Sequence, residues 1–351
     1  MTLCLRLAVA CLVLMASGCA NVGYYLQSVS GQLDIWRREQ PIGAVIADPA
    51  TPAALKEKLA QVQEIRRFAS TELDLPQNDS YTRYADLGRQ YVVWNVFATT
   101  EFSMQPMQWC FPFAGCVSYR GYFSRRDAER FAAGLAVRDN DVFVGGVPAY
   151  STLGWFADPV LNTFIHHPDY RIAQLIFHEL AHQKVYARND SVFNESFAAV
   201  VEEAGVRRWL ERHGTDRERS AYDRERAYRD DFVRLVQTYH GRLSALYDSD
   251  LSPAVMRERK GETLAEMNRD YAQLKTKWGG YSGYDAWFER RPNNAQIASV
   301  AIYTRLVPGF RALLRRHGGE LPGFYAAVQA LAALPADQRT DRLERLAASG
   351  P

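Results

Sequence analysis

One short segment of the chain carries residues that could bind a metal ion and activate water. In LIFHELAHQKVY, His178, Glu179 and His182 form the pattern H-E-x-x-H. In a helix, residues four apart lie one turn apart on one face, so both imidazoles can reach one metal ion while Glu179 faces the same cleft. Neutral imidazole suits zinc, and the pattern therefore predicts a zinc site with a base beside it. The alternative is a pair of hydrogen-bonded histidines on a buried helix.

A catalytic zinc site needs a third protein ligand and leaves a fourth position for water. The metzincin continuation is excluded, because Val185 and Arg188 stand where that pattern has glycine and histidine. Glu195 is the predicted third ligand, since it lies in a second helix that follows a short turn and can pack antiparallel to the first. Asp190 is the alternative ligand. Glu195 could instead be a carboxylate favoured by the dipole at a helix N-terminus.

Together these residues predict hydrolysis by an activated water molecule. Zinc lowers the pKa of its bound water towards about 7, and Glu179 would accept the proton and then deliver it to the leaving amine. A hydrogen-bond donor is also needed for the developing oxyanion. The candidate donors are four tyrosines, each of which could equally be a core residue: Tyr150, Tyr281, Tyr284 and Tyr303.

Other polar residues could form hydrogen bonds with the metal ligands and so orient them. A ligating histidine usually donates its second ring N–H to a carboxylate or carbonyl. Glu202 and Glu203 lie seven and eight residues after Glu195, so either could face the histidines from the second helix. Asn293 and Asn294 could line the site, although a cap of the following helix is the favoured interpretation.

Apolar spacing predicts the elements that must position these residues. Residues 170–187 and about 194–213 show helical spacing, as do residues 51–68. Residues 90–100 and 141–154 are rich in Val, Phe and Tyr, which is typical of strands. The strand segment 147–152 could bind a substrate backbone as an added strand, or it could be an ordinary sheet strand.

The second half of the chain is predicted to be helical. Between residues 216 and 278, apolar positions three and four apart on both sides of Ser252 and Pro253 indicate a helical hairpin. Its charges are of mixed sign, which favours a solvated face over contact with nucleic acid or membrane. Residues 294–316 are predicted to form a helix that is interrupted near Pro308.

The first residues indicate export. Arg6, an apolar run over residues 7–15 and three small residues precede Cys19, as in a bacterial lipoprotein signal. Acylation of Cys19 would anchor a periplasm-facing protein, and Ala20 rather than Asp at the next position favours the outer membrane. An ordinary cleaved signal is the alternative. A spanning helix is disfavoured, because the apolar run is shorter than about 18 residues.

Two cysteines remain beyond Cys19. Cys110 and Cys116 stand six residues apart in WCFPFAGCVSYRGYF. In an oxidising envelope, a short loop with Pro112 and Gly115 could bring the sulfurs together, so a disulfide is predicted. Two reduced thiols or a metal pair are the alternatives, and zinc is disfavoured here because a second cysteine pair is missing.

Composition limits the remaining possibilities. The 351 residues are 47% hydrophobic, 12% aromatic and 23% charged, which describes a globular chain and excludes disorder and fibrous repeats. Lys and Arg number 42 against 40 Asp and Glu, so the net charge is only +2 and gives no basis for nucleic-acid binding.

Several segments resemble a known family. FHELAHQ followed by FNESFA, with AYSTLGWFADPVLNTF and WCFPFAGCVSYRGYF upstream, resembles a bacterial family of predicted zinc aminopeptidases that are often lipoproteins. The similar segments run from about residue 24 to residue 310. The resemblance implies metallopeptidase activity with one zinc ion, and it puts His178, His182 and Glu195 on the family's metal positions and Glu179 on its catalytic one.

These observations predict a helix-rich α+β fold of the zincin-like metallopeptidase type. A small sheet would lie beside the metal helices, and a helical C-terminal lobe would carry the charged hairpin arm. Residues 1–18 are assigned to the signal peptide, 19–50 to the anchor and N-terminal segment, and 51–351 to one peptidase domain. The predicted function is a zinc-dependent envelope peptidase, an aminopeptidase acting on peptides. The alternatives are an envelope endopeptidase and a non-enzymatic, partner-binding lipoprotein with a structural metal site.

Overall fold

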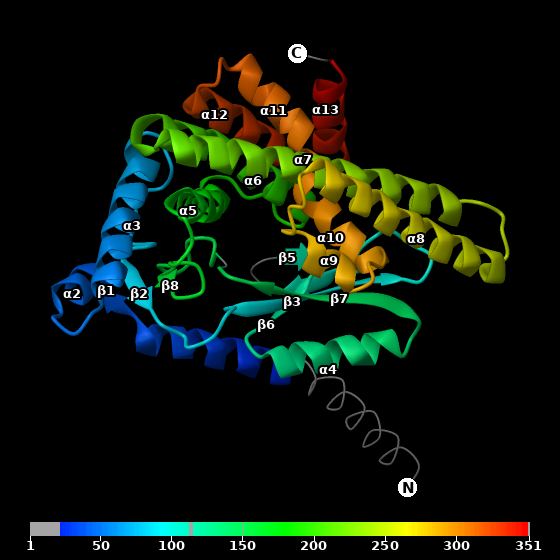
Figure 1. Ribbon diagram of the computed structural model, residues 1–351, viewed down its shortest axis with the longest axis horizontal. Helices are drawn as coiled ribbons and strands as arrows, with labels where there is room; N and C mark the ends of the chain where they lie inside the picture. Colours follow the sequence, from blue (N-terminus) through cyan, green and yellow to red (C-terminus); the bar gives the residue numbers. More distant parts are fainter. Residues whose placement is uncertain (1–21, 112–114, 150, 350–351) are drawn as a thin grey trace, which may run out of the picture.

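The structure, a computed structural model, describes residues 22–111, 115–149 and 151–349. Within them the fold is rich in helices with three small sheets, so the α+β prediction is confirmed (Figure 1). The helices are residues 22–38, α2 (Ile42–Ala47), α3 (Ala53–Thr71), α4 (Arg125–Ala136), α5 (Asp169–Lys184), α6 (Ser191–His213), α7 (Asp216–Tyr247), α8 (Pro253–Lys277), α9 (Asp285–Glu289), α10 (Asn294–Thr304), α11 (Val307–Arg316), α12 (Leu321–Ala332) and α13 (Ala336–Ala348). The strands are β1 (Gln40–Pro41), β2 (Arg83–Ala85), β3 (Val93–Thr100), β4 (Trp109–Phe111), β5 (Gly115–Val117), β6 (Arg120–Tyr122), β7 (Asn140–Val147) and β8 (Val160–Leu161).

The sheet beside the predicted site has the strand order β6-β3-β7, and its strands are antiparallel. β3 and β7 pair along their whole lengths, from Val93 opposite Val147 to Thr100 opposite Asn140. Alternate side chains of β3 point to opposite faces, so Val96 packs with α4 whereas Phe97 packs with α10. The sheet therefore lies between α4 and the helical half of the molecule (Figure 1).

The second predicted strand is shorter than expected. β7 ends at Val147 rather than near residue 154. Pro148 follows and has no backbone N–H with which to continue a ladder. Leu153 and Gly154 then adopt positive φ angles of 57° and 79° in a turn. The strand expected over residues 147–152 is therefore wrong beyond Val147 among the described residues, whereas its role in binding a substrate backbone stays a prediction.

Helices α5 and α6 form the buried centre of the fold. α5 ends at Lys184, three residues earlier than predicted, because Val185 is extended (φ −141°, ψ 130°). α6 begins at Ser191, because the Asp190 side chain caps it by accepting a hydrogen bond from the Phe193 N–H. Both helices pack in the main apolar core, together with α3 and helices near the C-terminus.

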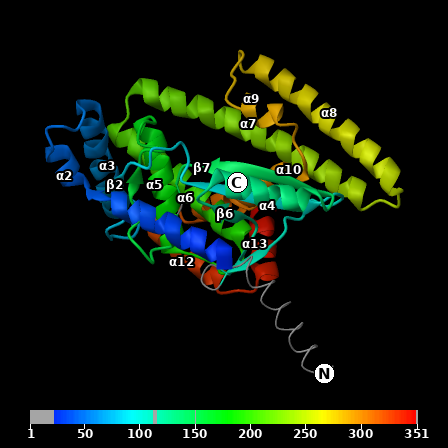
Figure 2. The same ribbon diagram turned by 90° about the horizontal axis from the view of Figure 1, so that it is seen from below.

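The predicted helical hairpin is present, since α7 and α8 lie side by side in both views (Figures 1 and 2). A capping box between Thr215 and Glu218 starts α7. The predicted interruption near Pro308 is also present, with Pro308 in the first turn of α11. The stretch Asn294–Arg316 is long and apolar enough to cross a membrane by composition alone, but α10 packs against α6, α7 and β3 as a core helix does.

The helix of residues 22–38 runs along the lower edge of the molecule in Figure 1 and lies in front in Figure 2. Its Gly31 lies against the ring of Phe123, where an added Cβ would be 2.1 Å from Cγ. The Gln27 side chain accepts a hydrogen bond from the Phe123 N–H (3.0 Å), and Ile35 is buried in the main core. This helix is thus an integral part of the fold.

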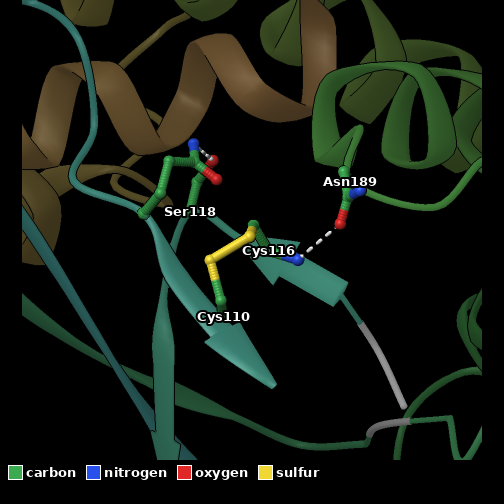
Figure 3. The surroundings of a disulfide bond; sticks show 5 residues. Cys110, Cys116, Ser118 and Asn189 are labelled. Carbon is green, nitrogen blue, oxygen red and sulfur yellow. Dashed lines mark hydrogen bonds between the residues drawn. A yellow bond between two sulfur atoms is a disulfide. The ribbon is translucent and has the colours of Figure 1, made fainter. Parts of the chain in front are cut away.

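A disulfide joins Cys110 of β4 to Cys116 of β5, which is the pairing expected from the sequence (Figure 3). The Cys116 N–H donates a hydrogen bond to the Asn189 side chain at 2.8 Å. Asn189 has a positive φ of 66°, a conformation in which asparagine is enriched. The disulfide hairpin is therefore attached to the turn between α5 and α6.

Removing the disulfide is expected to destabilise the fold. The double variant Cys110→Ser/Cys116→Ser should lower the free energy of unfolding by about 2 kcal/mol, the size expected for a short closed loop. Urea unfolding of the oxidised wild type, the reduced wild type and the double variant measures this difference. Equal stability of all three would contradict it.

Candidate metal centre

Three side chains from α5 and α6 converge on one point. His178 and His182 lie one turn apart on α5, and Glu195 lies near the start of α6. One ligand atom from each lies within 4.8 Å of the other two. The Nε2 atoms of His178 and His182 are 3.2 Å and 3.5 Å from the same oxygen of Glu195. Ligand atoms bound about 2.0 Å from a tetrahedral zinc ion lie about 3.3 Å apart, so this set fits one such cation.

The turn between the two helices fixes this spacing. The buried Asn194 side chain accepts a hydrogen bond from the Ala187 N–H (2.7 Å) and donates one to the Ala187 carbonyl (2.8 Å). Asp190, the alternative third ligand, caps α6 and pairs with buried Arg339 at 2.7 Å. Its carboxylate is therefore engaged outside the metal cluster, and Glu195 occupies the third place.

Glu202 forms a hydrogen bond with the ring nitrogen of His178 that does not face the metal cluster. Its Oε2 lies 2.9 Å from Nδ1 of His178, while Oε1 accepts hydrogen bonds from Arg229 (3.0 Å) and from the Gln174 amide. Burial raises the pKa of Glu202, but the hydrogen bond from His178 and the charge of Arg229 outweigh it and hold the pKa below its usual value. An ionised Glu202 favours the proton on Nδ1 of His178, which leaves Nε2 free to bind metal.

Glu203, the other predicted support, does not contact the histidines in the described structure. Its carboxylate pairs with Arg226 at 2.8 Å, Arg311 at 2.7 Å and Arg207 at 3.2 Å. Consecutive helix positions are about 100° apart, so only one of two adjacent glutamates can face α5. Among the described residues, Nδ1 of His182 is buried without a hydrogen-bond partner.

The three ligands and Glu179 line a cavity of about 440 Å³. Glu179 is buried next to the ligands; burial raises its pKa, and the neighbouring histidines oppose that rise only in part. The rest of the wall is mainly apolar and comes from the sheet, α5 and the helix of residues 22–38, including Tyr24, Val93, Phe111, Val117, Phe123, Val147 and Leu175. An apolar wall lowers the local dielectric and strengthens interactions between charges at the site.

Of the four predicted oxyanion donors, Tyr303 lines this cavity. Tyr119, which the sequence did not single out, lines it too. Burial, reinforced by the negative charge of Glu195, raises the pKa of both phenols well above the usual value. Both hydroxyls therefore stay protonated and can donate hydrogen bonds. Tyr150 lies outside the described residues.

Tyr281 and Tyr284 line a second cavity, of about 400 Å³. The two cavities share Pro148, Leu175, His178 and Glu179 in their walls, so they meet at the metal residues. The second wall is more polar and, besides the shared Glu179, contains three arginines and two glutamates: Arg171, Arg226, Arg229, Glu202 and Glu225.

Asn293 and Asn294 have structural roles. Asn293 caps α10 by accepting a hydrogen bond from the Gln296 N–H, as the favoured interpretation holds, and it donates one to the Val142 carbonyl. Asn294 is fully buried and donates to the carbonyl of Glu101. Neither residue lines the two cavities at the metal residues.

Three further contributors were missed at the level of sequence. Gln174 precedes His178 by four residues, a helical spacing that could have indicated it. Tyr119 stands in the cysteine-containing segment, but no spacing rule relates it to the histidines. Arg229 lies 27 residues after Glu202 on a different helix, and local periodicity carries no signal for such a contact.

Comparison with known proteins gives one match. A family model described as "Putative aminopeptidase" matches residues 23–343. No curated protein and no solved structure matches the chain.

Loss of the Glu202 carboxylate is expected to weaken metal binding. Glu202→Ala should reduce zinc affinity about 10- to 100-fold, because His178 loses the partner that orients its ring. Competition with a chromophoric chelator measures this affinity. Glu203→Ala is the matched control, since its carboxylate binds arginines only, and its affinity should stay close to that of the wild type. A similar loss in both variants would show that general destabilisation is the cause.

Proposed function

The chain belongs to the family described as "Putative aminopeptidase", and on this premise we propose that it is a zinc-dependent aminopeptidase of the bacterial envelope. One observation carries the proposal: two imidazole nitrogens and a carboxylate converge at zinc-like spacing in the wall of a cavity that also contains Glu179. A purely structural metal site has no use for a buried base beside the ligands.

The residues present fit a hydrolytic mechanism. Zinc held by His178, His182 and Glu195 supplies a Lewis acid for the scissile carbonyl and makes water more acidic. Glu179 accepts the proton of the attacking water and returns it to the leaving amine nitrogen. Its raised pKa suits the first half of this transfer, because a carboxylate of higher pKa is the stronger base.

Tyr303 and Tyr119 are the proposed donors to the carbonyl oxygen. Both line the cavity that contains the ligands, and burial keeps both hydroxyls protonated. A neutral donor aimed at the oxygen stabilises the negative charge that develops during attack. Tyr281 and Tyr284 are less suited to this role, since they lie in the second cavity.

The paired cavities support a peptide as substrate. They meet at His178 and Glu179, so a chain that crosses the metal residues has a pocket on each side of the reacting bond. The larger pocket is mainly apolar and suits an apolar side chain, whereas the smaller one carries paired arginines and glutamates.

An endopeptidase is the second candidate. An aminopeptidase must recognise a free α-ammonium group, generally with carboxylates or carbonyls near the metal. Among the described residues that line the larger cavity, Glu179 and Glu195 are the only carboxylates. The smaller cavity offers Glu225, but Arg171 already pairs with it at 2.9 Å.

The proposal of an envelope location is supported by one sequence feature and one disulfide. The chain begins with a lipoprotein-like signal that ends at Cys19. A disulfide between Cys110 and Cys116 is typical of proteins folded outside the reducing cytosol. We propose that acylated Cys19 anchors the protein in the outer membrane, with the folded chain facing the periplasm.

Two substitutions should affect zinc binding and peptide hydrolysis differently. The wild type, purified without chelator, is expected to hold one zinc ion per chain, and Glu195→Ala should lose most of it because one of three ligands is gone. Glu179→Gln should keep zinc and fold while peptide hydrolysis falls about 10²- to 10⁴-fold, the usual contribution of a general base. Atomic absorption and a peptide assay measure the two properties. Wild-type activity in Glu179→Gln would refute the catalytic proposal.

Blocking the N-terminus of the substrate peptide should distinguish an aminopeptidase from an endopeptidase. If the enzyme reads a free α-ammonium group, N-terminal acetylation of a peptide that it cleaves should abolish hydrolysis. Mass spectrometry of the products with free and acetylated peptides provides the measurement. Internal cleavage of both peptides at similar rates would favour the endopeptidase.

The anchor can be tested in cells. Cys19→Ala should move the protein from the membrane fraction to the soluble fraction, because it removes the proposed acylation site. Fractionation with immunoblotting gives the distribution, and Ser17→Ala is a matched control that keeps the cysteine and a small residue. Membrane retention of Cys19→Ala equal to that of the wild type would place the anchor elsewhere.

A further inference from the structure

The helix of residues 22–38 presents two faces of different character. Its inner face contacts the protein through Tyr24, Ser28, Gly31 and Ile35, spaced by four, three and four residues. The outward side carries a row of large apolar residues, with exposed Gly23, Ser30 and Arg37 along one edge of it. Each of the large apolar residues is 38% to 65% exposed: Val22, Tyr25, Leu26, Val29, Leu33 and Trp36.

The outer residues form one continuous stripe. At 100° per residue their positions fall within an arc of about 100°, centred about 140° from the middle of the inner face. The polar residues of the helix, such as Gln27, Ser30 and Arg38, fall outside this arc. A surface helix of a soluble protein normally shows the reverse arrangement, with its outer face polar.

The stripe continues onto a neighbouring loop. The Trp36 ring packs against Phe156, with 4.9 Å between ring centroids. Phe156 is 49% exposed and its neighbour Trp155 is 66% exposed. Tryptophan and tyrosine are the residues that favour the boundary between lipid and water.

We infer that this stripe lies on a phospholipid bilayer and that residues 22–38 form an interfacial helix. The helix cannot span the membrane, because its inner face is fixed to the protein by Gly31, Gln27 and Ile35. Its apolar outer face and the exposed aromatic rings at its C-terminal end suit the region of lipid headgroups.

The position of the stripe in the chain identifies lipid as the occupant. Val22 stands three residues after Cys19, the predicted acylation site, so an anchor there would deliver this end of the helix to a membrane surface.

The arrangement places the metal centre close to the membrane surface. Tyr24 and Ser28 on the inner face line the cavity that holds the ligands. The bilayer and that cavity are then separated by the thickness of a single helix, about 10 Å. Ser151 and Leu153 line the same cavity, and their loop also carries the exposed Trp155 and Phe156.

Vesicle binding without the acyl chain tests the inference independently of the anchor and of the peptidase activity. All described elements begin at residue 22 or later, so the chain 20–351 keeps the described fold. This chain should sediment with vesicles of phosphatidylethanolamine and phosphatidylglycerol. Leu26→Glu/Val29→Glu should bind about 100-fold more weakly, since each change removes one buried aliphatic side chain worth about tenfold.

Ser30→Glu is the control, because it adds a glutamate to the same helix outside the stripe, one negative charge against the two of the double variant. It should bind vesicles as the wild type does, and all three proteins should keep their zinc content and circular dichroism spectra. Brominated lipids should quench tryptophan fluorescence less in Trp36→Phe/Trp155→Phe than in the wild type. The inference would be overturned if the wild type did not bind vesicles, or if Leu26→Glu/Val29→Glu bound them equally well. It would also be overturned if the wild type formed a dimer without lipid and this variant were monomeric.

Discussion

The candidate metal centre depends on the neutralisation of carboxylates buried within α6. Glu195 and Glu202 are both buried, and an ionised carboxylate in such a place is costly unless it is paired and hydrogen-bonded. The histidines of α5 pair with them from one side, and Arg229 of α7 pairs with Glu202 from the other. The positions of α5, α6 and α7 are therefore linked through charge as well as through apolar packing.

The same constraint explains the charged hairpin. Its sequence gives a mixed surface pattern, which favours a solvated arm, and the outer residues of α7 and α8 fit that description. Arg226 and Arg229, however, point their charges at Glu203 and Glu202. Arg311 of α11 reaches Glu203 as well, so helices far apart in the chain meet over the acidic pair of α6. The hairpin thus has a structural role at the site in addition to its exposed face.

Local patterns were enough to predict the α5 and α6 pair, the hairpin, the break near Pro308 and the cysteine pairing. Each of these depends on residues close together in sequence, so spacing and turn residues carry the information. The end of β7 and the choice between Glu202 and Glu203 needed one-residue precision, which periodicity does not provide. Arg229, and the contacts of residues 22–38 with β6 and the cavity, depend on tertiary packing between distant segments. The apolar spacing of that helix is visible in the sequence, but only the structure shows which of its two faces is buried.

The ligand set is unusually local in the chain, since His178 and Glu195 are only 17 residues apart. The Asn194 clamp on Ala187 closes the turn between them with two hydrogen bonds that join residues only seven apart. A folding chain can therefore form the α5 and α6 pair early, because short-range contacts cost little loop-closure entropy. The cation could then bind the α5 and α6 pair before the rest of the chain has folded. Its availability would influence the folding rate as well as the activity.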